Sequence, residues 1–177
     1  MPTVASKPGQ QIGQQHTITI LVENRPGVLA RVAGLFARRG YNVDSLAVSI
    51  TEDPTMSRMT VVCTGDGYIL DQITKQLGKL IDIIRVADYT DMPMLERELA
   101  LIKVNADVTK RGEIKELVEI FRAKIIDIGE TTFTIEVTGN VEKITAFESL
   151  LEPYGIREMV RTGRIALVRG ARTAAQS

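Results

Sequence analysis

An order of strands and helices that occurs twice along the chain constrains its fold more than any other feature of the 177 residues. The run over 17–22 alternates between polar and apolar residues and is rich in β-branched residues, which is typical of a strand. Apolar residues from Val28 to Phe36 recur at three- and four-residue spacing, as on one face of a helix that begins at Pro26 and ends at Gly40. The first half continues with expected strands over 42–50, 59–63 and 83–87 and a helix over 70–81.

The second half repeats this β-α-β-β-α-β order, and Pro93 interrupts both kinds of pattern between the halves. The sequence therefore predicts an α+β fold of two ferredoxin-like (βαββαβ) units. The elements expected in the second half are strands over 97–104, 124–128, 132–137 and 159–168, the last with a bend at Gly163, and helices over 112–121 and 144–151. The expected ranges are a flexible tail over 1–16, a first unit over 17–91, a second unit over 95–170 and a flexible end over 171–177.

Composition excludes several classes of function. The chain has 22 Lys and Arg residues against 22 Asp and Glu residues, and this balance argues against a general nucleic-acid-binding surface. One Cys and one His cannot supply a disulfide within the chain or a zinc site built from several such side chains. No stretch has the roughly 18 apolar residues of a membrane span, and the polar first residues lack the apolar core of an export signal. We therefore expect a cytoplasmic protein with no membrane or nucleic-acid partner and no metal.

The residues that could support catalysis lack the partners that catalysis needs. His16 lies between the tail and the first strand, where we expect it to be solvated and without a role. Cys63 lies within an apolar strand and is expected to be packed and unreactive. The run 65–67 has only two glycines of a dinucleotide fingerprint and is better explained as a turn. The carboxylates expected on solvated faces are those of Glu96, Glu98, Glu113 and Glu116.

The size of each predicted unit favours association between copies. A unit of roughly 75 residues buries only about 60% of the surface of its unfolded chain and is marginally stable alone. Helices cover one side of each antiparallel sheet, which leaves its other face and its edges to be covered. The apolar residues Ile18, Ile20 and Val22 predict that a partner surface covers the first strand, so we expect an oligomer.

The loop from Asn24 to Leu29, between the first strand and the first helix, is the best candidate for a binding site. The N–H groups at a helix N-terminus attract anions, including a carboxylate. Gly27 lets a ligand approach the backbone, and the amide of Asn24 offers both a donor and an acceptor to a free amino acid. Val28 and Leu29 would then meet a small aliphatic side chain. The alternative explanation is structural, with Asn24 as a helix cap and Gly27 as a turn residue.

The run Glu23–Val32, followed by Gly34–Phe36 and Arg39–Leu46, resembles the ACT domain of the small regulatory subunit of acetohydroxyacid synthase, or acetolactate synthase. The resemblance covers about 17–170, with the ACT domain in the first unit. The further segments that look like this family are Asp53–Pro54, Ser57–Thr60, Gln76–Leu77, Lys79–Leu80, Glu96–Leu99, Phe121–Asp127 and Arg161–Gly170.

The resemblance implies a non-catalytic regulatory subunit that binds and activates a catalytic subunit and confers feedback inhibition by L-valine in branched-chain amino-acid biosynthesis. It implies no cofactor in this chain, because thiamine diphosphate, magnesium and FAD belong to the catalytic partner. It also implies a homodimer through the ACT domains, with valine between them. The valine contacts that it implies are Asn24, Gly27, Val28 and Leu29 from one subunit and Asn42 and Val43 from the other.

Two other functions are compatible with the residues alone. An ACT-type sensor that controls transcription would need a basic recognition element. A small stand-alone enzyme would turn over pyruvate or an amino acid without a partner. The choice among valine, leucine and isoleucine is not readable from the sequence, because they differ by as little as a methylene, which is worth about 1–3 kcal/mol in an apolar pocket. We expect the catalytic subunit to contact the hairpin over 53–58, including Arg58, or the second unit.

Overall fold

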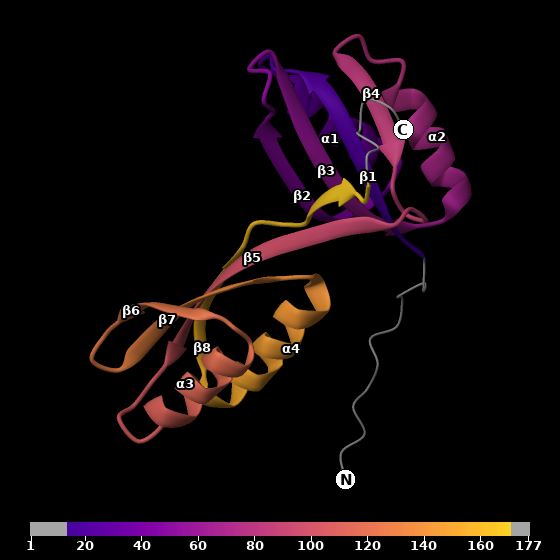
Figure 1. The fold of residues 1–177 in the computed structure, drawn as a ribbon. Coiled ribbons are helices and arrows are strands. Elements are labelled where there is room, and N and C mark those ends of the chain that lie inside the picture. Colours follow the sequence, from indigo (N-terminus) through magenta and orange to yellow (C-terminus); the bar gives the residue numbers. More distant parts are fainter. Residues whose placement is uncertain (1–13, 171–177) are drawn as a thin grey trace.

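The computed structural model of the chain describes residues 14–170, which form two sheets with two helices against one face of each (Figure 1). The first sheet is antiparallel, with the strand order β2-β3-β1-β4. The predicted βαββαβ order is therefore confirmed in the first unit. Its elements are β1 (Gln14–Glu23), α1 (Val28–Arg38), β2 (Asn42–Ile50), β3 (Met56–Gly65), α2 (Gly67–Leu77) and β4 (Ile83–Asp88).

The second unit has the same order, with one strand more. Its sheet has the order β6-β7-β5-β8, and the additional strand β9 pairs with β5. The α+β fold class and the ferredoxin-like arrangement of both units are confirmed. The elements are β5 (Met94–Asn105), α3 (Arg111–Ile120), β6 (Lys124–Ile128), β7 (Thr132–Gly139), α4 (Val141–Leu151), a 3₁₀ turn (Glu152–Tyr154), β8 (Ile156–Arg161) and β9 (Ile165–Val168).

The two expected tails fall mostly outside the described residues. Residues 1–13 and 171–177 are not described, so the prediction of flexible ends is not tested there. Residues 14–16, which we expected in the first tail, belong instead to β1, because they pair with residues 63–65 of β3. The expectation of a tail over 14–16 is therefore wrong.

The first helix begins later than its sequence predicts. α1 starts at Val28, two residues after Pro26, because Gly27 adopts φ +84° outside the helical region and caps the helix. The predicted end of the helical pattern is confirmed by Gly40, which has φ +71° directly after the last turn. In the second helix, Leu77 is the last residue, and Ile81, which we expected to belong to it, is 94% exposed in the loop that follows.

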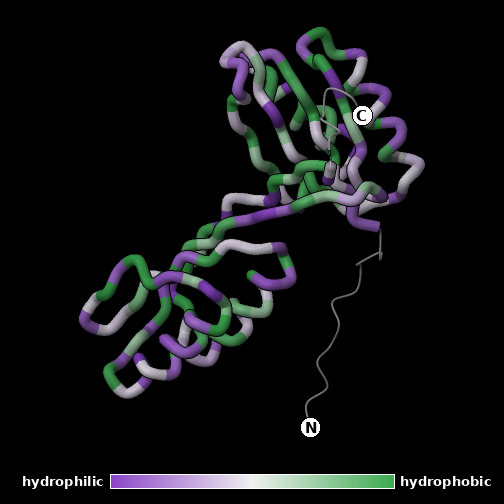
Figure 2. The backbone as a smooth tube through the Cα atoms, viewed as in Figure 1, coloured by the Kyte–Doolittle hydropathy of each residue, from purple (hydrophilic) through white to green (hydrophobic). Residues whose placement is uncertain are grey.

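The strand β5 runs from beside the first sheet into the second sheet (Figure 1). Its first residues, 94–97, pair with 165–168 of β9 in a two-stranded ribbon, which we call the ribbon below. From Glu98 onward, β5 pairs with β7 in the second sheet. Figure 1 shows the ribbon passing beside the first sheet, and the hydrophilic stretch of β5 between the units can be followed in Figure 2. The ribbon residues of the second predicted unit, 95–170, thus lie against the sheet of the first predicted unit, 17–91. The division of the chain into these two units therefore stays a prediction.

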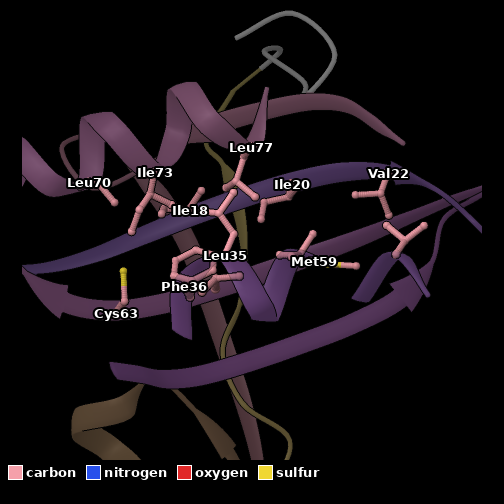
Figure 3. Packing of buried hydrophobic residues seen from close by; sticks show 13 residues of the cluster. Ile18, Ile20, Val22, Leu35, Phe36, Met59, Cys63, Leu70, Ile73 and Leu77 are labelled. Atoms are coloured by element: carbon pink, nitrogen blue, oxygen red, sulfur yellow. The ribbon is translucent and has the colours of Figure 1, made fainter. Parts of the chain in front are cut away.

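Each unit has its own apolar core between sheet and helices. In the first unit, Ile18, Ile20 and Val22 point towards α1 and α2 and have at most 1% of their surface exposed (Figure 3). The prediction that a partner surface covers them is wrong, because the helices of the same chain already do so. On the opposite face of β1, Thr17 and Thr19 are each only 2% exposed, although both are polar. The ribbon explains this burial, because it lies on that face of the sheet.

Candidate functional site

The loop between β1 and α1 is held in place by Asn24. Its backbone N–H donates to the carbonyl of Thr55 at 2.7 Å, and its side-chain Nδ2 donates to the carbonyl of Pro54 at 3.0 Å. Its Oδ1 accepts a hydrogen bond from the Ser57 hydroxyl at 3.2 Å. An amide has two N–H donors and two acceptor lone pairs, so Asn24 keeps one of each for a ligand. The side chain can both fix the loop and contact an amino acid.

The N-terminus of α1 opens beside Asn24 without a side-chain cap. Gly27 occupies the cap position, and the first turn carries no acidic residue. The first N–H groups of a helix have no helical acceptor and carry a partial positive charge. A carboxylate at this point would therefore meet backbone donors that no side chain caps.

The two apolar residues of the predicted site differ in exposure. Val28 is 3% exposed and packs in the core, so its side chain does not reach the surface of this chain. Leu29 is 44% exposed beside the edge of the sheet. An aliphatic contact from this loop to a ligand therefore comes from Leu29.

The other predicted contacts lie at the opposite end of β2. Asn42 pairs with Thr64, whereas Ile50, at the other end of the strand, pairs with Ser57 beside the Asn24 loop. At about 3.3 Å per residue, these ends are about 25 Å apart. Asn42 is exposed, and Val43 is partly buried against the core. One chain thus does not bring the two groups of predicted contacts together.

The free edge of β2 is apolar. In the strand order of the first sheet, β2 has a neighbour only on the β3 side. Leu46, Val48 and Ile50 are 37%, 42% and 58% exposed along it. They line a groove of about 1050 Å³ that continues to Leu95 and Leu167 of the ribbon. An exposed apolar edge strand is a surface that natural proteins cover by pairing.

His16 is not solvated, contrary to the sequence prediction. It is 3% exposed, and its Nε2 lies 3.3 Å from the Gly65 carbonyl oxygen. Its Nδ1 lies 3.4 Å from the hydroxyl of Thr90, which in turn donates to the carboxylate of Asp88. The prediction failed because β1 begins at Gln14, two residues before His16.

Cys63 agrees with its prediction. It has no exposed surface, and burial raises the pKa of its thiol to about 11. A reactive thiol needs access and a lowered pKa, so Cys63 is an inert core residue. Within residues 14–170, no group of three His, Cys, Asp or Glu side chains is placed to hold a metal. In the same residues, no helix is long and apolar enough to cross a membrane.

Two carboxylates that we expected in solvent lie instead between the units. Glu98 is 7% exposed, because it accepts hydrogen bonds from Arg161 Nε at 2.9 Å and Nη2 at 2.8 Å. This bonding to Glu98 raises the pKa of the Arg161 guanidinium. Glu96 forms an ion pair with Arg164 at 3.2 Å. The sequence prediction for Glu96 and Glu98 is wrong, because their burial depends on arginines more than sixty residues away along the chain.

Arg58 is also placed differently from what we expected for a contact with a catalytic subunit. Its Nη2 donates to the carbonyl of Ala166 in β9 at 2.8 Å. The side chain therefore joins two parts of the same chain. The truncation Arg58→Ala would loosen this internal contact, so it is not a clean probe of a partner surface.

Comparison with known proteins identifies the family. The family model described as the small subunit of acetolactate synthase matches residues 97–170, and the AHAS small subunit-like ACT domain matches residues 18–85. A probable acetolactate synthase small subunit of Archaeoglobus fulgidus is 55% identical over 156 residues, which are 88% of this chain and 98% of that protein. The chain belongs to the acetolactate synthase small-subunit family.

Further relatives agree with this assignment. The acetolactate synthase small subunit of Mycolicibacterium smegmatis is 52% identical over 157 residues, which are 89% of this chain and 92% of that protein. The crystal structure of the acetolactate synthase small subunit from Thermotoga maritima has a TM-score of 0.82 and 42% identity. It covers 89% of this chain and 99% of that one. The resemblance stated from the sequence is confirmed.

Membership in the acetolactate synthase small-subunit family defines the class of function. The chain is a regulatory subunit with an ACT domain, and its partner is the catalytic subunit of the enzyme. The alternative of a stand-alone enzyme is therefore wrong. The sequence did not single out Arg164, which joins β9 to the first sheet. Its neighbours in the Arg161–Gly170 run supplied only a family likeness, without a role.

Proposed function

We propose that this chain activates the catalytic subunit of acetolactate synthase and confers feedback inhibition by L-valine on it. The ACT domain over 17–91 binds valine, and thiamine diphosphate, magnesium and FAD are held by the catalytic subunit. The complex works in the cytoplasm. The observation that supports the proposal best is the uncapped N-terminus of α1 next to the side-chain amide of Asn24, which keeps one N–H donor and one acceptor lone pair for a ligand.

The effector site is formed by two copies of the chain. Asn24, Gly27 and Leu29 lie at one end of β2, and Asn42 and Val43 lie at the other. A second copy that pairs with the free edge of β2 in the antiparallel direction brings opposite ends of the two strands together. The site then holds the carboxylate at the helix N-terminus, the ammonium group at the Asn24 amide and the aliphatic side chain near Leu29.

Regulation follows from a difference in affinity. If valine binds one arrangement of the ACT dimer more tightly, it changes how the two small subunits hold the catalytic subunits. The shift cannot exceed that difference, which is typically of order 1–3 kcal/mol in such systems. Saturating valine therefore lowers the activity of the complex by a finite factor.

Titration calorimetry of the full chain with L-valine tests the effector site, with D-valine as the ligand control. We expect saturable binding of the L-form to the wild type and loss of binding in Asn24→Ala. The matched control is Asn105→Ala, which removes an amide with one hydrogen bond, to Arg157, in the second unit. Binding that survives Asn24→Ala unchanged would contradict the site. Titration with leucine and isoleucine in the same series decides the effector preference.

Reconstitution with the catalytic subunit tests the function itself. We expect the chain to raise acetolactate formation by the catalytic subunit and L-valine to reverse part of the gain. Catalytic activity that is unchanged by the chain would contradict the proposal, whatever the calorimetry shows.

A further inference from the structure

A buried arginine fastens the ribbon to the first sheet. Arg164 precedes β9 and is 9% exposed. Its Nη1 donates to the hydroxyl of Thr17 at 3.3 Å, and its Nη2 donates to Oε1 of Gln15 at 2.9 Å, so both groups bind β1. Its backbone N–H donates to the hydroxyl of Ser45 in β2 at 2.8 Å. A single residue of the second unit thus holds two strands of the ACT domain.

The charge of Arg164 is balanced within the ribbon. Its Nε lies 3.2 Å from Oε2 of Glu96, with the geometry of an ion pair and not of an aligned hydrogen bond. Burying a guanidinium is costly unless it is paired and hydrogen-bonded. The arrangement satisfies that condition only while the ribbon lies on the sheet, because the partners come from both parts of the chain.

The residue before Arg164 brings the ribbon into close contact with β2. Gly163 has φ +83°, and a side-chain carbon on it would lie 2.9 Å from the Ser45 hydroxyl oxygen and 3.2 Å from the Leu46 carbonyl oxygen. Ser45 and Leu46 lie on the same strand as Asn42 and Val43, with Asp44 between the two pairs. The contact therefore lies next to the residues that the proposed effector site uses.

The same end of the ribbon is also fixed to the second unit, because Glu98 follows Arg97 and Arg97 pairs with Ile165. Glu98, where β5 enters the second sheet, is bound by two nitrogens of Arg161 at the end of β8. Arg161 and Arg164 are separated by two residues. The contacts of Arg164 with the first sheet and of Glu98 with Arg161 of the second sheet therefore meet at one end of the ribbon.

We propose that Arg164 is a positioning residue for regulation, which couples the effector-binding edge β2 to the second unit. The inference rests on the proposed function and adds the route by which the effector acts. Removing the guanidinium leaves the residues of the effector site in place, yet loosens the attachment of the ribbon to the ACT domain, which then depends on the bonds of Arg58 to Ala166 and of the Arg164 backbone to Ser45.

Hydrogen–deuterium exchange tests the mechanical half of the inference without any effector. In Arg164→Gln, we expect the amides of 94–97 and 165–168 to exchange at least about tenfold faster than in the wild type, because local opening costs less free energy. The amides of β7 should keep their protection. The matched control Arg169→Gln replaces an exposed arginine directly after β9 and should leave both regions unchanged. Equal protection of the ribbon in Arg164→Gln and the wild type would overturn the inference.

The reconstituted holoenzyme tests the regulatory half. We expect Arg164→Gln to bind L-valine with a Kd within about threefold of the wild type, whereas the inhibition at saturating valine, typically a factor of about 5–150 in coupled systems, falls towards none. Arg164→Lys keeps the charge next to Glu96 and should restore part of the inhibition, which a mere packing defect would not do. Full inhibition of the Arg164→Gln complex would overturn the inference.

Failure of the proposed function and failure of the inference about Arg164 give different results. A wild-type chain that binds no valine refutes the proposed effector. The exchange experiment needs no effector and still tests whether Arg164 holds the ribbon on the first sheet. If Arg164→Gln does not fold, Glu96→Gln replaces it, because this variant removes the ion pair and keeps the bonds to Gln15 and Thr17. An intermediate loss of ribbon protection in Glu96→Gln supports the inference, and wild-type protection overturns it.

Discussion

Cys63 lies in the middle of the first core with no exposed surface, and its environment keeps the thiol protonated. Burial is the largest cause of its raised pKa of about 11, and the negative charges of Asp44 and Asp88 add to it. The thiol contributes apolar contacts to the core near Phe36 and Ile18 (Figure 3). Protonation of this residue is thus tied to the folded state.

The raised pKa predicts a loss of stability at alkaline pH. The folded thiol has a pKa of about 11 against an ordinary value of 9.0, so the unfolded chain releases the proton first as the pH rises. The unfolding free energy should therefore be unaffected by Cys63 below about pH 9 and fall between about pH 9 and 11, by up to about 3 kcal/mol. Urea denaturation of the wild type and of Cys63→Ala at about pH 8 and about pH 10 measures this difference. A parallel decline in both proteins would refute the assignment to Cys63.

Two polar residues are buried by partners that lie far away along the chain, and no local sequence pattern predicts such partners. His16 and Glu98 were expected in solvent, and both are buried. The partners of His16 are Gly65 and Thr90, and the partner of Glu98 is Arg161. Each partner is at least 49 residues away along the chain, so no local pattern reveals it. Asn24 and Gly27 were identifiable, because the loop chemistry that singles them out is local.

At the scale of elements, the turn between β8 and β9 fixes the ribbon. Gly163 combines φ +83° with close contact to β2, whereas Gly40, with φ +71°, has open space where a side-chain carbon would be. A non-glycine residue in the left-handed region costs about 1–2 kcal/mol. A side-chain carbon on Gly163 would in addition lie 3.2 Å from the Leu46 carbonyl oxygen, a tight contact with the backbone that only a shift of β2 or of the turn relieves.

Gly163→Ala should therefore be more destabilising than Gly40→Ala. We expect Gly40→Ala to lower the unfolding free energy by about 1 kcal/mol and Gly163→Ala to lower it by at least about 2 kcal/mol. Thermal and urea unfolding of the two variants give the comparison, in which Gly40→Ala accounts for backbone strain alone. Equal losses would show that β9 moves away from β2 without cost.

The sequence predicted the helices and hairpins better than the ribbon. The strands over 42–50 and 124–128 were predicted to the residue, because each alternates within itself and ends at a local turn signal. The closing strand over 159–168 was predicted with its bend, but not its separation into β8 and β9. β9 pairs with residues about 70 positions earlier, so its register depends on the folded units and not on any nearby pattern.

The face of β1 was misjudged for a related reason. Ile18 and Ile20 alternate with Thr17 and Thr19, which correctly predicts one apolar and one polar face. We expected a partner on the apolar face, although the helices of the same unit occupy it. The polar face is buried too, because the ribbon returns from the second unit to cover it. Sequence alternation shows which side chains share a face, and tertiary contacts decide what covers that face.

At the scale of the whole molecule, the two units leave different edges uncovered. The first sheet ends in β2, with an apolar edge beside α1, and the second sheet ends in β8 on one side. The groove of about 1050 Å³ follows β2 and continues over the ribbon. This continuity makes the β2 edge, and not the β8 edge, the surface along which two copies pair in the proposed dimer.

A charge on the β2 edge should therefore dissociate the dimer. Val48 is 42% exposed there, and a lysine on an edge strand opposes pairing with another strand. We expect Val48→Lys to be monomeric in sedimentation equilibrium at concentrations where the wild type is a dimer. The same variant should lose L-valine binding in calorimetry, because Asn24 and Asn42 of different copies no longer meet.

The matched control is Val160→Lys, which places the same charge on the edge strand β8, where Val160 is 57% exposed. It should remain dimeric and bind valine as the wild type does, since the second sheet takes no part in the proposed site. A dimeric Val48→Lys that still binds valine would place the interface elsewhere. A monomeric Val160→Lys would assign the pairing of the two copies to the second unit. The effector site would then have to be complete within one chain, whose Asn24 loop and Asn42 are separated by about 25 Å of strand.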